Sequence, residues 1–293
     1  MSIEYLRKPE WLKIDLGLSD DLKLVKKELR DKGLSTVCEE ARCPNLHECW
    51  GKFRTATFLL LGDVCTRLCK FCSVKHGRPS AVDKNEPTRV ADAVKRLGIR
   101  HVVLTMVTRD DLVDGGASIV AGTVRAVRGV DESITTEVLV SDFRGNSEAL
   151  SILAESEPDI VSHNIETVRA LTPKVRSGFS YDASLEFLKK AGEAISSYGG
   201  ILKSSLMLGL GETEEDVRES LMDLRHCGVR IVNIGQYLQP SKEQISVVRY
   251  VRPEEFYSYK EYALSIGFDV CNSGPLVRSS YHAEDSAGLI GSR

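Results

Sequence analysis

The chain has 293 residues, 42% of them hydrophobic and 28% charged, so it is long enough and apolar enough to bury a full core. Its formal net charge of −3 gives no basic excess for binding nucleic acid. The longest apolar run, FLLL at 58–61, is too short to span a membrane, and the charged start MSIEYLRKPEWLK lacks the apolar stretch of a signal peptide, so we expect a cytoplasmic protein.

The first predicted element is a helix over 19–32, in which Leu22, Val25 and Leu29 share one face and Gly33 can end the helix. From residue 57 onward, short apolar strands alternate with helices. Strands are predicted near residues 57, 101, 134, 159, 201 and 229. Helices are predicted over 88–98, 115–128, 146–156, 181–198, 213–227 and 252–267, with a further short helix from Glu166.

Alternating strands and helices predict a parallel sheet with right-handed crossovers. Six units are too few for a closed eight-fold barrel, so we expect an open partial (βα)6 barrel over 57–267. Residues 1–56 then form an N-terminal extension and residues 268–293 a C-terminal extension. We expect the two extensions to close the mouth of the barrel.

Polar motifs follow five of the predicted strands, where the chemistry of such folds gathers. In chain order they read VTRDDLVDGG, SDFRGN, HNIET, GLGET and QYLQPS. Because the carboxyl ends of parallel strands meet at one end of a barrel, these motifs predict a common site there.

Eight cysteines are many for a chain expected in the cytosol, where disulfides are rare, and they indicate metal or redox chemistry. Six of them lie between residues 38 and 72. The other two, Cys227 and Cys271, stand alone and are expected to be small buried hydrophobic residues.

The stretch CTRLCKFC carries Cys65, Cys69 and Cys72 in the spacing C-x3-C-x2-C. Structural zinc sites use four ligands, usually as two separated pairs, whereas three thiolates suit a [4Fe–4S] cluster with one iron left free. An open metal position is typical of catalysis, because something other than the protein binds there. A zinc site or a purely structural role is the alternative for this triplet.

GDVCTRLCKFC resembles the signature of radical S-adenosylmethionine (SAM) enzymes, with Phe71 as the aromatic residue before the third cysteine. The resemblance implies a (βα)6 barrel in which SAM chelates the free iron and is cleaved to methionine and a 5′-deoxyadenosyl radical. It also implies that Cys65, Cys69 and Cys72 generate this radical.

The resemblance gives two strand-end motifs a role in binding SAM. Asn164 and Glu166 are candidates for the ribose or the amino-acid part, and Gly209, Gly211 and Glu212 for the adenine. Each has a structural alternative. Asn164 and Glu166 also fit a helix cap and a first-turn acid, and GLGET fits a tight turn into the next helix.

A second triplet, CEEARCPNLHEC, places Cys38, Cys43 and Cys49 in the spacing C-x4-C-x5-C. The spacing favours a second iron–sulfur cluster, with a zinc site completed by His47 as the alternative. The triplet has no fourth cysteine nearby, so the remaining iron needs water, substrate or a non-cysteine ligand.

The whole chain closely resembles the lipoyl synthase family, a branch of the radical SAM enzymes. The matching segments are RKPEWLK, CEEARCPNLHECW, GDVCTRLCKFCSVKHGRP, VTRDDLVDGGA, HNIETV, MLGLGETEEDV, NIGQYLQPSKEQ and RSSYHA. The resemblance implies that Ser280, the second serine of RSSY, joins Cys38, Cys43 and Cys49 on an auxiliary [4Fe–4S] cluster. Arg278 and Tyr281 either support that site or are a solvated arginine and a core tyrosine.

The reaction implied by the resemblance is insertion of two sulfur atoms at C6 and C8 of an octanoyl chain held on a lysine of a carrier domain. The auxiliary cluster supplies the sulfur and is consumed, and two SAM molecules and a one-electron reductant are needed. The carrier is a 2-oxo acid dehydrogenase subunit or the glycine-cleavage H protein. The competing interpretations are a methylthiotransferase, a zinc-binding interaction module and a two-cluster electron-transfer protein.

Overall fold

The computed structural model describes residues 7–13, 20–40, 43, 45, 46, 49 and 57–280. An eight-stranded sheet runs in the order β1-β2-β5-β6-β7-β8-β9-β10 and is not closed between β1 and β10 in the described residues. Its strands are β1 (Ser35–Thr36), β2 (Thr57–Leu60), β5 (His101–Met106), β6 (Thr135–Leu139), β7 (Ile160–Ser162), β8 (Ile201–Leu208), β9 (Ile231–Gln236) and β10 (Val270–Gly274). All neighbours pair in parallel except β1 and β2. The predicted open partial barrel is confirmed.

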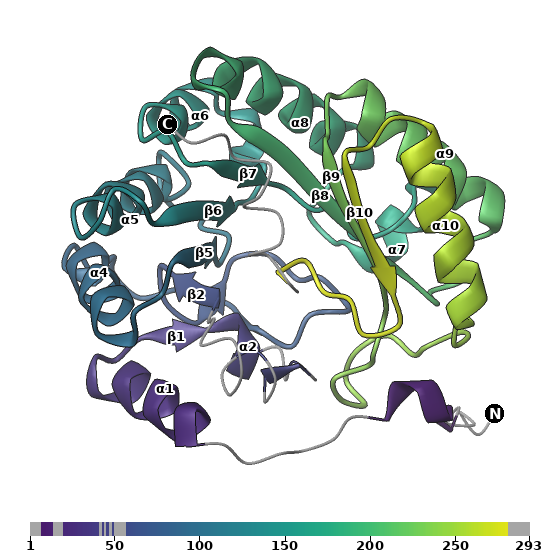
Figure 1. Cartoon of the computed structure of the whole chain (residues 1–293), viewed down its shortest axis with the longest axis horizontal. Helices are drawn as coiled ribbons and strands as arrows, with labels where there is room; N and C mark the ends of the chain where they lie inside the picture. The colour runs from purple at the N-terminus through teal and green to yellow at the C-terminus, as the bar shows by residue number, and fades with distance from the viewer. Residues whose placement is uncertain are drawn as a thin grey trace.

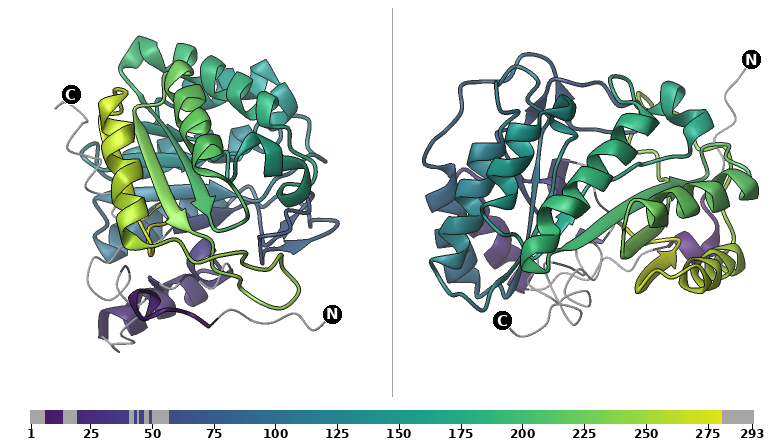
Figure 2. Two further views of the ribbon diagram at one scale, coloured as in Figure 1. Left: turned by 90° about the vertical axis from the view of Figure 1, so that its right-hand side faces the viewer. Right: turned by 90° about the horizontal axis from the view of Figure 1, so that it is seen from above.

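The main helices lie around the outer face of the curved sheet, as Figure 1 and the two further views of Figure 2 show. They are α4 (Glu86–Leu97), α5 (Ala117–Arg128), α6 (Ser147–Ala154), α8 (Tyr181–Ile195), α9 (Glu214–His226) and α10 (Pro253–Ser265). Since the strands follow one another in chain order, right-handed crossovers place every connecting helix on the same face. The connecting helices named above therefore leave the inner face of the sheet open to the cavity.

Shorter elements complete the chain. The helices are α1 (Asp20–Asp31), α2 (Val37–Glu40) and α7 (Thr172–Val175), and the small parallel pair is β3 (Val64–Cys65) with β4 (Lys75–His76). Single 3-10 turns are η1 (Glu10–Leu12), η3 (Phe143–Gly145), η4 (Arg169–Leu171) and η5 (Ser196–Tyr198). No helix in the described part of the chain has both the length and the apolar character needed to cross a bilayer.

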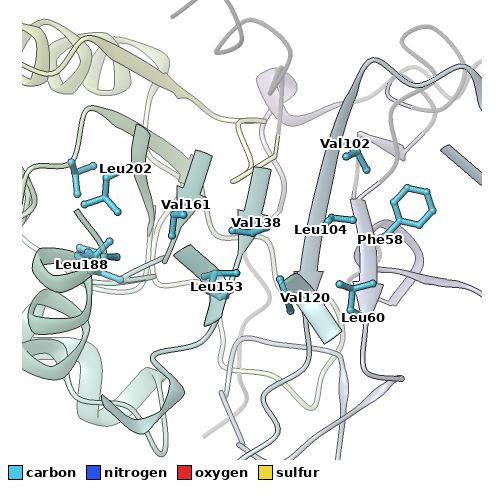
Figure 3. Packing of buried hydrophobic residues seen from close by; sticks show 14 of the residues in the cluster. Phe58, Leu60, Val102, Leu104, Val120, Val138, Leu153, Val161, Leu188 and Leu202 are labelled. Atoms are coloured by element: carbon cyan, nitrogen blue, oxygen red, sulfur yellow. The ribbon is translucent and has the colours of Figure 1, made fainter. Parts of the chain in front are cut away.

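Successive side chains of each strand point alternately to the hydrophobic core outside the barrel and to the cavity inside it. Side chains that point outward pack against the helices, as Figure 3 shows for Leu60, Leu104, Val138, Val161 and Leu202 of the strands and Val120, Leu153 and Leu188 of the helices. Their neighbours in sequence point inward, because successive side chains of a strand face opposite sides. Leu59, Thr105, Leu139 and Ser205 line the interior of the barrel.

All six predicted strands are present, but the sheet is larger than the prediction. β10 pairs in parallel with β9 and extends the sheet into the predicted C-terminal extension, and β1 pairs with the other edge. The expected short helix from Glu166 is wrong. Glu166 has a φ of 64°, and its backbone bonds to Ser205 and Met207 of β8, so helical structure begins only at Arg169.

Candidate active site

A cavity of about 460 Å³ lies inside the barrel and is lined by residues from the carboxyl ends of its strands. Both cysteine triplets and the C-terminal serine line this one cavity: Cys38, Cys43, Cys49, Cys65, Cys69, Cys72 and Ser280. Phe71, Asn164 and Glu166 line it as well. Residues from both ends of the chain therefore contribute to the wall. His47 and Tyr281 lie outside the described residues.

The loop that carries the first triplet is held by backbone bonds on several sides. The amide of Gly77 donates to the carbonyl of Cys65 (2.9 Å) where β3 pairs with β4, and the amide of Lys70 donates to Val175 of α7 (2.9 Å). The side chain of Gln244 donates to the carbonyl of Cys72 (3.3 Å). These contacts order three thiols that are close in sequence on one side of the cavity.

Arg67, between the first two cysteines, anchors the same loop through charge. Its guanidinium bonds to Asp110 (2.7 and 2.9 Å) and to Asp142 (2.7 Å), and it stacks on the ring of Phe179. Burial alone would lower the pKa of Arg67, but the two carboxylates raise it, so the guanidinium stays charged. The motifs VTRDD and SDFRGN thus act as supports for the cysteine loop.

The thiols of the first triplet fit an iron–sulfur cluster. Burial raises the pKa of Cys69 to about 12 and that of Cys72 to about 11, so both are neutral thiols at pH 7 without a metal. Iron ligation displaces such protons, and the cysteine-lined wall offers three ligands at once. Within the described residues no three His, Cys, Asp or Glu side chains are close enough to share a single metal ion. In a cluster, by contrast, each cysteine binds its own iron.

Polar atoms without a partner point to a second ligand beside these thiols. Asn164 donates to the carboxylate of Glu166 (3.0 Å), while its own Oδ1 is buried and accepts no hydrogen bond from the described residues. The Nε of Arg176 is buried and equally lacks a partner there. Burial raises the pKa of Glu166, although Arg176 opposes the shift. A ligand rich in hydroxyl, amino and carboxylate groups, such as SAM, would satisfy these atoms.

The GLGET residues lie outside the described lining of the cavity. Gly209 and Gly211 have φ values of 98° and 112°, and the Glu212 carboxylate accepts the amides of Gly209 (2.5 Å) and Leu210 (2.9 Å). This geometry is that of a tight turn between β8 and α9. The turn still reaches the site indirectly, because Leu210 packs in one apolar cluster with Phe71.

The second triplet is joined to the C-terminal segment. Asn45 donates to the carbonyl of Leu276 (2.7 Å), and the amide of Cys49 donates to the carbonyl of Asn45 (2.9 Å). Burial raises the pKa of Cys43, and the nearby charge of Arg278 partly offsets this shift. The segment that ends in Ser280 is therefore attached to the loop of the second triplet.

The remaining cysteines have no link to this cavity. Cys271 on β10 is buried, and Cys227, at the end of α9, is half-buried and packs against the core. None of the eight cysteines forms a disulfide. Arg67, His163 and Arg176 were not predicted as site residues, although Arg67 lies within CTRLCKFC and His163 within HNIET. Their burial beside polar partners reveals their roles.

Comparison with known proteins agrees with this geometry. Residues 59–224 match the model of the Radical SAM superfamily, and residues 2–43 match the N-terminal domain of lipoyl synthase of the Radical SAM family. Lipoyl synthase of Bacillus cytotoxicus is 55% identical over 282 residues, which cover 96% of this chain and 94% of that protein. Lipoyl synthase of Shouchella clausii is 54% identical over 282 residues, 96% and 91% of the two chains.

Solved structures share the fold at low sequence identity. Streptococcus suis SuiB bound to its precursor peptide SuiA has a TM-score of 0.58 at 12% identity, covering 93% of this chain and 58% of that one. Methylornithine synthase has a TM-score of 0.54 at 15% identity, covering 87% and 83%. The superfamily match over most of the barrel and the long, highly identical relatives lead to one assignment. The chain is an enzyme of the lipoyl synthase family within the radical SAM superfamily.

Proposed function

We propose that this enzyme inserts two sulfur atoms, at C6 and C8, into an octanoyl chain carried on a lysine of a partner domain. Membership of the radical SAM superfamily implies a [4Fe–4S] cluster and SAM, and membership of the lipoyl synthase family implies a protein-bound octanoyl substrate. The observation that carries the proposal is that the two cysteine triplets line the same cavity. A radical source and a sulfur source must face one substrate carbon, and this arrangement would allow it.

The residues that line the cavity suggest which cysteines hold each cluster. In the proposal Cys65, Cys69 and Cys72 hold the first cluster, while Cys38, Cys43, Cys49 and Ser280 hold a second. When bound, the first cluster with SAM supplies the radical that removes a hydrogen atom from an unactivated carbon, and the second cluster supplies the sulfur. A serine alkoxide such as that of Ser280 is more basic than a thiolate, so protonation can release it from iron, which suits a cluster that must give up sulfide.

The protein's own residues bind, orient and exclude water. Asn164 and Arg176 offer the vacant hydrogen-bonding atoms for SAM, and Glu166 offers a buried carboxylate beside them. Apolar side chains including Leu59, Leu139 and Leu206 surround the remaining space. Apolar side chains at these positions suit an alkyl chain and help to keep water from a carbon radical.

Two partners belong to the proposal. The substrate arrives on a lipoyl carrier domain, either a 2-oxo acid dehydrogenase subunit or the glycine-cleavage H protein. A one-electron reductant must also reach the first cluster, since cleavage of SAM consumes one electron.

The test compares two triple variants with the wild type after anaerobic loading with iron and sulfide. We expect about eight irons per wild-type chain and about four in Cys38→Ala/Cys43→Ala/Cys49→Ala. With SAM, a reductant and an octanoyl-lysyl peptide, that variant should still cleave SAM but form no thiolated peptide. The variant Cys65→Ala/Cys69→Ala/Cys72→Ala should also hold about four irons and should leave SAM intact.

The competing interpretations give different results. A zinc-binding module would take up zinc and remain colourless, and a two-cluster electron carrier would bind iron without cleaving SAM. Thiolated product from the variant that lacks the first triplet would refute the proposal.

A further inference from the structure

The segment after β10 turns back across the barrel and lies directly against β9. In Figure 1 it is the yellow stretch that leaves the end of β10 and returns towards the middle of the molecule. Arg278, Ser279 and Ser280, at its end, line the cavity, but the described C-terminal segment contributes no regular element after Gly274. Something other than secondary structure must therefore hold Ser280 in place.

A side chain of β9, Asn233, makes two of the hydrogen bonds that attach this segment. Asn233 is 0% exposed, and its Nδ2 donates to the carbonyls of both Arg278 and Ser279 at 2.9 Å. Its Oδ1 accepts from Asn272, the residue beside it on β10 (3.1 Å). Because both carbonyls require a donor and Asn272 occupies the oxygen, the orientation of the amide is determined by its partners.

The backbone of the segment approaches β9 too closely for any side chain at Gly235. A Cβ at this position would lie 2.0 Å from the carbonyl oxygen of Val277. The guanidinium of Arg278 donates to the carbonyl of the next residue, Gln236 (3.2 Å). The segment therefore packs against two successive inward-facing positions of β9, Asn233 and Gly235.

We propose that Asn233 is a positioning residue that holds Ser280 at the iron of the second cluster. This inference rests on the proposed function, in which Ser280 is a ligand. The two carbonyls that Asn233 holds belong to the two residues immediately before Ser280, so their position determines where the Ser280 hydroxyl can reach. Asn45 donates to the carbonyl of Leu276, which ties the same segment to the loop that carries the cysteines of that cluster.

The chemistry of the amide makes the role specific to asparagine. Asn233→Ala removes both donors and leaves two carbonyls without them. Asn233→Asp keeps the shape but turns a donor into an anion facing two carbonyl oxygens. Gly235→Ala acts independently, because its methyl group would push Val277 away without touching Asn233. Ser273→Ala is the matched control, since the Ser273 hydroxyl lies on β10 but bonds outward to the carbonyl of Phe256.

The first measurement uses the full chain without iron. Hydrogen–deuterium exchange of the Val277 amide, which donates to the carbonyl of Gly274 (3.1 Å), should accelerate about 30-fold in Asn233→Ala, because two ordinary hydrogen bonds that hold this turn against β9 are lost. Asn233→Asp and Gly235→Ala should accelerate it as well, whereas Ser273→Ala should leave it at the wild-type rate. Unchanged exchange in the Asn233 variants would overturn the proposal. If Asn233→Asp does not fold, Asn233→Ala and Gly235→Ala still decide the question.

The second measurement isolates the second cluster. In a background of Cys65→Ala/Cys69→Ala/Cys72→Ala, the Mössbauer spectrum reports only the iron held by Cys38, Cys43 and Cys49. Asn233→Ala should shift the signal of one iron site in the same way as Ser280→Ala. If Ser280→Ala changes the spectrum and Asn233→Ala does not, the positioning role is refuted while the proposed ligand stands. If Ser280→Ala also leaves the spectrum unchanged, the ligand assignment of the proposed function fails and Asn233 is only a fold contact.

Discussion

His163 is a buried imidazole in the wall of the cavity, and its hydrogen bonds define its protonation. Nδ1 lies 2.9 Å from the carbonyl of Val140, so this nitrogen carries the proton, and Nε2 accepts from Ser184 (3.1 Å). Arg176 also donates to Ser184 (3.1 Å), which connects the imidazole to the guanidinium with the vacant Nε. Burial, helped by the charge of Arg176, lowers the pKa of His163 to about 4.

This shift predicts a pH dependence of stability. The unfolded chain protonates His163 near its ordinary pKa of 6.5, whereas the folded chain does so only near 4, so stability falls as pH drops between these values. The loss should reach about 3 kcal/mol. His163→Gln keeps a donor for Val140 and should flatten this part of the profile, measured by urea unfolding of the iron-free protein. The exposed His226→Gln serves as the control, and an identical slope in both variants would contradict the assignment.

A buried ion pair in the barrel interior gives a second prediction at this scale. Lys203 and Glu137 are both 0% exposed and lie 2.8 Å apart across β8 and β6. Burial would raise the pKa of Glu137, but Lys203 and His101 hold it below its usual value. Lys203→Met should destabilise the protein by about 3–5 kcal/mol, because it leaves a carboxylate buried without its cation.

The double variant Lys203→Met/Glu137→Leu should recover most of that loss, since it removes both charges. Urea unfolding of the wild type, the two single variants and the double variant forms a complete cycle. A double variant as unstable as the sum of the two single ones would show that the charges do not interact.

Among the elements, the turn between β8 and α9 allows a test of whether Glu212 stabilises the fold or binds SAM. Both oxygens of the Glu212 carboxylate accept backbone amides of the same turn. Glu212→Gln keeps one acceptor and should cost about 2 kcal/mol of unfolding free energy in the cofactor-free protein. The same turn is also predicted from the sequence to contact SAM through Gly209 and Gly211. If Glu212→Gln is less stable than the wild type only when SAM is added, Glu212 contacts SAM directly and does not stabilise the turn.

The elements also show where sequence patterns work. The six core strands and their helices carry clear apolar periodicity. The reason is that outward-facing strand residues such as Leu104 and Val161 pack in one core with the helices. β10 was missed because its stretch VCNSG is polar at Asn272 and Ser273, which bond to β9 and α10 instead of packing in the core. The helix expected at Glu166 was wrong because an Asn-x-Glu pattern suits a helix cap, while here the backbone pairs with β8.

The cysteines of the site could be predicted from the sequence, but the residues that support them could not. Cysteine spacing indicated two separate metal centres, and the structure brings both triplets to one cavity. The buried supports, Arg67 and Arg176, are single arginines among many, and only three-dimensional contacts distinguish them. No local pattern relates Asn233 to a segment 45 residues later in the chain.

For the molecule as a whole, the N-terminal extension both carries cysteines and covers an edge of the sheet. β1 pairs antiparallel with β2, and α1 lies beside α4, where Lys32 of the connecting turn contacts Asp92 (3.4 Å). Deleting residues 1–50 should remove the second cluster and retain about four irons and SAM cleavage. The exposed edge of β2 should also promote association, which light scattering would detect. Retention of both clusters would contradict the role assigned to this extension.

The shared cavity has a kinetic consequence. A reactive group confined to about 460 Å³ meets a partner in the same space as if that partner were present at about 4 M. Dissolved thiols or oxygen would be present at far lower concentrations. A carbon radical formed beside both triplets would therefore be captured inside the barrel long before it could encounter a competitor from solution.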